Sequence, residues 1–166
     1  MATDGSEKAV DASVYAVELA KCLGAEIIAL HVVSDHEVSY TAFDVGHPPP
    51  GETHLGEMQV TRARFTGWHH DEDHEKASER LRDAQGKGLD YVQEVVEKAN
   101  SAGVKVGSKC CVMGDAALQI INSAKEENSD LIVMGFSGTS NPEKNTLGRV
   151  AAKVVQNTPC PILIVR

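Results

Sequence analysis

Two hydrophobicity patterns alternate along the chain. Runs of apolar and β-branched residues at 26–33, 104–112, 130–136 and 158–166 are typical of strands, and the most continuous of them indicate strands covered on both faces. Between these runs, apolar residues recur at helical spacing after Ser6, over about 75–102, over 114–128 and after Gly148, which predicts amphipathic helices. Strands that alternate with helices predict an α/β domain with a mostly parallel sheet and helices on both of its faces.

Local signals mark several helix ends. Asp4, Gly5 and Ser6 form a turn and N-cap signal before the first helix, and Gly24 is a typical stop signal after it. Two glycines at 86 and 88 lie in the middle of the long 75–102 helix. Each weakens a helix by about 1 kcal/mol relative to alanine, so we expect a kink or a break there.

Two regions depart from the regular alternation. Residues 34–75 contain "HPPPG" and "WHHDEDHE" with little periodicity, and a connection of this length is usually a functional insertion or a mobile loop. At the other place, only three residues precede Asp4, whereas a strand that feeds the first helix needs about five residues. We therefore expect the chain to begin inside a strand, or this strand to be unusually short.

Candidate chemistry is concentrated in "VMGFSGTSNPEKNTLGRVAAKVV", residues 133–155, where glycines follow a strand and precede a helix. We expect Gly135 to leave room for a ligand at the strand end and Gly138 to permit a positive φ in the loop. Gly148 would let an anion approach the N–H groups of the following helix, whose N-terminus is partially positive. The alternative, that the glycines serve only as turns and as a helix start, is equally compatible with their spacing.

Composition and charge exclude some partners. The 166 residues fit one domain, and 16 basic against 24 acidic residues give a net charge of −8, which does not favour nucleic acid or an anionic membrane surface. No apolar run approaches the about 20 residues of a membrane span, and no export signal is recognisable, so we expect a cytoplasmic protein.

Two segments resemble the universal stress protein family. "TDGSEKAVDASVYAVELAKCLGAEIIALHVV" is similar to the first strand end, helix and second strand of that family, and "GDAALQIINSAKEENSDLIVMGFSGTSN", continuing to "LGRVAAKVVQNTPCPILIVR", is similar to its C-terminal half. The resemblance covers about residues 2–33 and 90–166 of one domain spanning 1–166, and the 34–75 insertion lies outside it. It implies a doubly wound, five-stranded parallel sheet of order 3-2-1-4-5 and a homodimer formed through the C-terminal strand.

The resemblance also implies the binding site. The ATP-binding members carry G-x2-G-x9-G followed by Ser or Thr, which Gly135, Gly138 and Gly148 match until Arg149 replaces the hydroxyl residue. By the same resemblance, the nucleotide lies near the following residues: Thr3, Asp4, Val32, Val33, Met134, Ser140, Asn141 and Val150.

Arg149 leaves three alternatives open. Its guanidinium would donate charge-assisted hydrogen bonds to a phosphate, would fill the phosphate space, or would point to solvent from the first helical turn. A charged hydrogen bond contributes roughly 1.5–3 kcal/mol, so the first alternative would strengthen phosphate binding.

The histidines give a weaker signal. His70 and His74 are four apart, a workable ligand pair for Zn or Ni if the segment is helical, and Asp73 would lie on the same face. Two or three ligands without a fixed fourth are a weak signal, so we expect no metal site. We expect His31, inside a strand, to be a satisfied core or edge histidine rather than a catalytic base.

These observations predict a stress-response protein that binds ATP, with or without Mg²⁺, or a related adenine nucleotide, and regulates rather than catalyses. One alternative is a nucleotide-free dimeric interaction module of the same family. An adenylating or ATP-hydrolysing enzyme is the remaining alternative, but Asp4-Gly5-Ser6 lacks the paired glycines of the adenylating loop and no nucleophile–base pair can be placed. We expect at most a weak ATPase.

Overall fold

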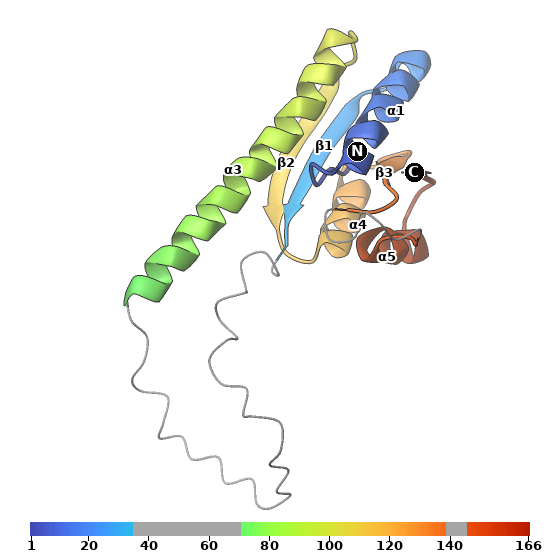
Figure 1. Ribbon diagram of the computed structural model, residues 1–166. Coiled ribbons are helices and arrows are strands. Elements are labelled where there is room, and N and C mark those ends of the chain that lie inside the picture. The colour runs from blue at the N-terminus through green and yellow to red at the C-terminus, as the bar shows by residue number, and fades with distance from the viewer. Residues whose placement is uncertain (35–70, 139–145) are drawn as a thin grey trace, which may run out of the picture.

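The computed structural model describes residues 1–34, 71–138 and 146–166 (Figure 1). The elements in these residues are, in order, α1 (Glu7–Leu23), β1 (Ile27–Val33), α3 (Asp71–Ser101), β2 (Val106–Met113), α4 (Ala116–Glu126), β3 (Ile132–Gly135), α5 (Arg149–Asn157) and β4 (Ile162–Val165). The predicted α/β class is therefore confirmed. Residues 35–70 of the predicted 34–75 insertion lie outside the described residues, and α3 begins at Asp71, a few residues earlier than expected.

Two pairs of parallel strands form the sheet. β1 pairs with β2 from Ile27 to Val33, and β3 pairs with β4 from Ile132 to Gly135. Within each pair the two strands run in the same direction, so their carboxyl ends lie at the same edge.

Residues 1–3 lie between the two pairs and join them. The N–H of Ala2 donates to the carbonyl of Val133 on β3 (3.0 Å), and the N–H of Thr3 donates to the carbonyl of Leu30 on β1 (2.9 Å). Ala2 also forms a parallel bridge with Leu30. In the predicted order 3-2-1-4-5 the first strand lies at the centre of the sheet, and this short segment occupies that position.

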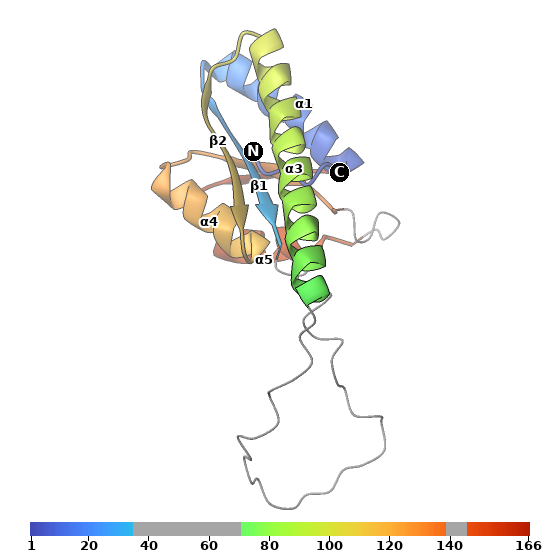
Figure 2. The same ribbon diagram turned by 90° about the vertical axis from the view of Figure 1, so that its left-hand side faces the viewer.

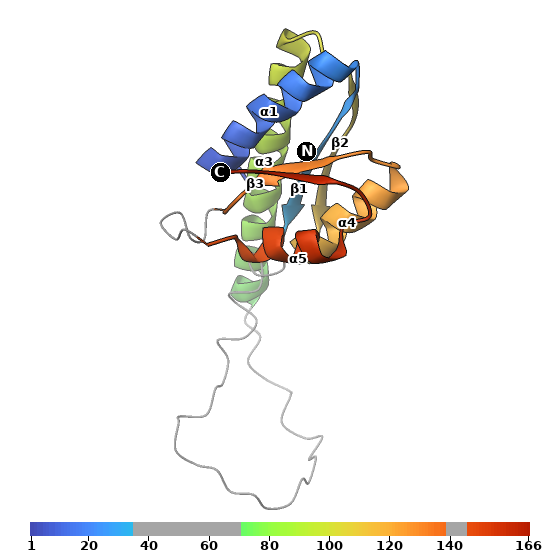
Figure 3. The ribbon, with the colours of Figure 1, turned by 90° about the vertical axis from the view of Figure 1, so that its right-hand side faces the viewer.

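Helices cover both faces of the sheet. α1 and α3 pack on one face, and α4 and α5 pack on the other, as Figures 2 and 3 show from opposite sides. Each face has its own core, one built around α1 and α3 with Val92 and Val95, the other around α4 and α5 with Ile121 and Val154. Within the described residues, no helix is long and apolar enough to cross a membrane.

The helix-end signals that the sequence predicts for α1 are confirmed, and α4 has a similar N-cap. Ser6 is the N-cap of α1, and its hydroxyl accepts a hydrogen bond from the N–H of Ala9 (3.3 Å). Gly24 ends α1 in the left-handed conformation, with φ of 63°. Asp115 caps α4 by accepting a hydrogen bond from the N–H of Leu118 (3.1 Å).

The kink predicted at Gly86 and Gly88 is wrong, because α3 runs without interruption through both glycines (Figure 1). Gly88 is buried, and a Cβ there would overlap the imidazole of His31 on β1. The glycine thus allows α3 to approach the sheet closely, and the packing gained offsets the poor helix propensity.

Candidate functional site

The carboxyl ends of the central strands open onto a cavity of about 430 Å³. Its walls come from residues 2–4, the last residues of β1 and β3, the beginning of α4 and the first turn of α5. This is the point where strand order reverses, between residues 1–3 and β3, and ligands of doubly wound sheets bind at such a point.

Most of the predicted site residues line this cavity: Thr3, Asp4, Val32, Met134, Gly135, Gly138, Gly148, Arg149 and Val150. Val33 does not, because it is fully buried and neighbouring residues of a strand point to opposite faces. Ser140 and Asn141 lie outside the described residues.

An apolar wall of the cavity was missed in the sequence analysis. It includes Leu30, Ala116, Ile120 and Ala151. Leu30 precedes Val32 by two residues, and Ile120 follows Ala116 by four, so strand and helix periodicity place the two members of each pair on one face. This periodicity identifies the four residues as buried. It does not show whether they line a ligand cavity or belong to the core, which depends on where they lie relative to the ends of the strands.

Asp4 occupies the turn that leads from residues 1–3 into α1. One carboxylate oxygen, Oδ1, accepts hydrogen bonds from the N–H (3.1 Å) and the hydroxyl (2.6 Å) of Ser6. The other oxygen, Oδ2, lies against Gly138, where a Cβ would overlap it. The positive φ predicted for Gly138 is wrong. Gly138 instead leaves space for the Asp4 carboxylate at the edge of the cavity.

The other two glycines of the motif also allow close packing. Gly135 lines the cavity, and a Cβ there would lie 2.9 Å from the carbonyl carbon of Lys8, so the glycine also allows α1 to pack closely on the end of β3. A Cβ at Gly148 would lie 3.2 Å from Cα of Ser137, and the N–H of Gly148 donates to the carbonyl of Phe136 (2.9 Å). Close packing at Gly148 and its hydrogen bond to Phe136 thus hold the start of α5 against the segment that follows β3.

The start of α5 is the electropositive side of the cavity. Gly148 provides no side-chain cap, so the first N–H groups of the helix keep their partial positive charge. Arg149 is exposed, lines the cavity and has no ion pair within the described residues. Among the described lining residues, Asp4 and Arg149 are the ionisable ones. The cavity therefore joins an apolar wall to an acidic and a basic group.

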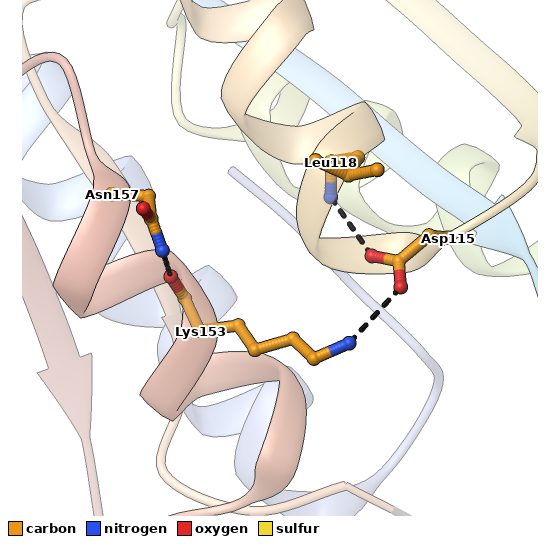
Figure 4. Close-up of polar contacts among 4 residues, drawn as sticks. All are labelled: Asp115, Leu118, Lys153 and Asn157. Carbon is orange, nitrogen blue, oxygen red and sulfur yellow. Dashed lines mark hydrogen bonds and ion pairs between the residues drawn. The ribbon is translucent and has the colours of Figure 1, made fainter.

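A polar contact joins the N-cap of α4 to the middle of α5 (Figure 4). Nζ of Lys153 lies 3.1 Å from Oδ2 of Asp115, and the Lys153 carbonyl accepts a hydrogen bond from the Asn157 amide (2.9 Å). The N–H of Leu118, followed by Lys153, holds the pKa of Asp115 below its usual value. Lys153 is thus engaged with Asp115, and Arg149 is the cation that faces the cavity in the described residues.

The histidine predictions have different outcomes. His70 and the side chain of His74 lie outside the described part of the structure. No group of three metal-ligating side chains occurs in the part of the chain that the structure describes. The prediction for His31 is confirmed, since it is buried and its Nδ1 lies 2.9 Å from the carbonyl oxygen of Thr3.

Sequence comparisons identify relatives along the whole length of the chain. The family model described as the universal stress protein family matches residues 1–166. Universal stress protein YxiE of Bacillus subtilis is 32% identical over 166 residues, which cover 100% of this chain and 96% of that protein. Universal stress protein MJ0531 of Methanocaldococcus jannaschii is 30% identical over 164 residues, covering 99% of this chain and 78% of that protein.

Solved structures share the fold. Universal stress protein UspA from Lactobacillus plantarum has a TM-score of 0.71 at 22% identity, with 99% of this chain and 94% of that chain covered. A universal stress protein in complex with cAMP has a TM-score of 0.61 at 21% identity, covering 100% and 94%. A universal stress protein from Archaeoglobus fulgidus in complex with dAMP has a TM-score of 0.51 at 19% identity, covering 99% and 94%. The full-length family match and the two relatives, together with this fold and cavity, show that the chain belongs to the universal stress protein family.

Proposed function

We propose that the cavity binds an adenine nucleotide, with ATP as the principal ligand, and that the protein regulates rather than catalyses. The observation that carries this proposal is the two-sided character of the cavity. Its apolar wall, with Val32 and Met134, suits a flat base, and the uncapped start of α5 with Arg149 suits phosphate. The cAMP and dAMP complexes of structural relatives support an adenine nucleotide in this family.

The charges of the lining suggest how such a ligand is oriented. Phosphates would lie beside Arg149 and the first N–H groups of α5, where both the side chain and the helix end favour an anion. The Asp4 carboxylate would repel phosphate and would accept hydrogen bonds from sugar hydroxyls, or would contact a Mg²⁺ bound to the nucleotide. The base would then lie at the apolar end, beside Val32 and Met134.

A regulatory role agrees with the chemistry of the described lining. The lining offers Asp4 as a carboxylate but no histidine or cysteine, so the pair of groups that activates a nucleophile is not assembled there. Family membership supports a role in a stress response, and we place that role in the cytoplasm as part of the same proposal.

Equilibrium dialysis tests nucleotide binding directly. Refolded, nucleotide-stripped protein should take up ATP in the presence of Mg²⁺, and Arg149→Met should bind about ten- to a hundredfold more weakly because a charged hydrogen bond is lost. Val155→Ala, an exposed change at the other end of α5, is the matched control and should bind as the wild type does. No uptake at millimolar ATP would overturn the proposal and favour a nucleotide-free interaction module.

We also propose that the protein forms a homodimer through β4. β4 is an edge strand of the sheet, and its residues Ile162, Leu163 and Ile164 are only partly buried. An uncovered apolar edge tends to pair with another strand. Sedimentation equilibrium should give about twice the 17.8 kDa chain mass. A single-chain mass throughout the micromolar range would contradict this.

A further inference from the structure

His31 and Tyr91 lie directly behind the turn that carries Asp4. Backbone pairing between residues 1–3 and β1 includes the hydrogen bond from the Thr3 N–H to Leu30. The next polar group of the chain, the Thr3 carbonyl, lies 2.9 Å from Nδ1 of His31. A carbonyl can only accept, so Nδ1 carries the hydrogen and donates it. The His31 side chain thus continues the hydrogen bonding between residues 1–3 and β1 beyond the last backbone pair.

Tyr91 of α3 contacts both His31 and the turn. Its ring meets the His31 ring edge to face, with centroids 5.5 Å apart and an interplanar angle of 66°. The same ring lies against Gly5, where a Cβ would overlap it, and Gly5 has a φ of 73° that favours glycine. The turn is thus fixed at Thr3 by a hydrogen bond and at Gly5 by an aromatic ring.

Gly88 makes this arrangement sterically feasible. It lies one turn before Tyr91 on α3, and its missing side chain leaves the space that the His31 ring fills. A Cβ at Gly88 would also lie 2.8 Å from Sγ of Cys111, the residue paired with His31 on the neighbouring strand. His31 therefore has little freedom to rotate away from Thr3.

The turn held in this way presents two residues to the cavity. Thr3 and Asp4 both line it, and the Asp4 carboxylate lies against Gly138 in the glycine motif. Neither His31 nor Tyr91 lines the cavity. Any effect that they have on a ligand is therefore indirect, and the part of the lining that both contact is the turn of residues 3–5.

We propose that His31 and Tyr91 are positioning residues of the nucleotide site, which fix the Thr3–Gly5 backbone and thereby set the place of the Asp4 carboxylate. This inference rests on the proposed nucleotide binding. It assigns to α3 a role in ligand affinity, although no residue of α3 lines the described cavity.

Two pairs of variants of the full chain test the proposal. His31→Leu removes the donor to Thr3, whereas His31→Asn keeps an amide N–H near the position of Nδ1. Tyr91→Ala removes the ring that lies on Gly5, whereas Tyr91→Phe keeps it. ATP affinity is measured by equilibrium dialysis, and hydrogen exchange at the Gly5 and Ser6 amides, which are both hydrogen-bonded within the turn, is followed by ¹H–¹⁵N NMR without nucleotide.

The proposal predicts up to about tenfold weaker ATP binding for His31→Leu and Tyr91→Ala, because ATP must then order a turn that one hydrogen bond or one aromatic contact holds in the free wild type. His31→Asn and Tyr91→Phe should stay within about twofold of the wild type, a rescue that a general loss of stability would not produce. Hydrogen exchange at the Gly5 and Ser6 amides should be faster in the first two variants only. Should His31→Leu fail to fold, the Tyr91 pair alone decides.

Two results would overturn the proposal: wild-type ATP affinity in both disruptive variants, or an equal loss in the disruptive and the conservative variants. If the wild type itself binds no ATP, the proposed function fails on its own. Hydrogen exchange at the two amides then still decides whether His31 and Tyr91 fix the turn, because it is recorded without ligand.

Discussion

Alanine at Gly86 and alanine at Gly88 should change stability in opposite directions, although both glycines lie in the middle of α3. The helix-propensity gain is nearly the same at the two positions, about 0.8–1 kcal/mol. At Gly86 a Cβ meets no atom within 4 Å, so Gly86→Ala should keep the whole gain. At Gly88 a Cβ overlaps the His31 ring, so Gly88→Ala must displace a buried side chain.

The loss of stability expected for Gly88→Ala comes from displacing the His31 side chain. Overpacking a well-packed site costs about 1–3 kcal/mol. Moving the imidazole also breaks its hydrogen bond to the Thr3 carbonyl, which adds about 1 kcal/mol. After subtraction of the propensity gain, Gly88→Ala should be about 1–3 kcal/mol less stable than the wild type. The two variants should therefore differ by about 2–4 kcal/mol.

Urea denaturation followed by circular dichroism measures this difference. The two midpoints should lie on opposite sides of the wild-type midpoint with similar slopes, because the area exposed on unfolding hardly changes. In thermal scans the melting temperatures should differ by about 10 °C, at about 2–4 °C per kcal/mol for a chain of this size. Equal stabilisation by both alanines would refute the close packing of α3 on His31.

Two further comparisons test the packing around the cavity. Asp115→Ala should lose about 1 kcal/mol of stability at neutral pH through its helix cap, whereas Lys153→Met should lose at most about 0.5 kcal/mol. The folded-state pKa of Asp115 is lowered, so its ionised carboxylate stabilises the fold above the unfolded-state pKa of about 4, and this stabilisation is lost as pH falls through the folded-state pKa. The stability difference between Asp115→Ala and the wild type, measured in urea, should therefore shrink in acid. A stability difference independent of pH would contradict this. Val154→Ala should lose about 2–3 kcal/mol of stability because Val154 is fully buried, whereas Val155→Ala should stay within about 0.5 kcal/mol of the wild type because Val155 is 42% exposed. Urea denaturation measures both variants, and similar losses in the two would be inconsistent with this burial.

Features that depend on neighbouring residues were predictable from the sequence. The N-cap at Ser6 and the stop at Gly24 are set by hydrogen bonds and dihedral angles within a few residues. The alternation of strands and helices was equally visible, because burial imposes its own period on each element. These local signals, together with the family resemblance, placed the cavity at the correct edge of the sheet.

Features that depend on distant residues were not predictable in this way. Gly88 was interpreted as a weak point of α3, because nothing in its neighbourhood reveals that His31 needs the space. Gly138 was assigned a positive φ, whereas its actual constraint is the carboxylate of Asp4, at the opposite end of the chain. In both cases the reason for the glycine is a contact that exists only after the sheet has formed.

A crystal structure of the protein grown with ATP and Mg²⁺ would test the central claim most directly. The account predicts electron density for the base beside Val32 and Met134, and for phosphate at the first turn of α5 within reach of Arg149. A cavity that stays empty at saturating ATP, or a nucleotide bound elsewhere on the surface, would contradict it.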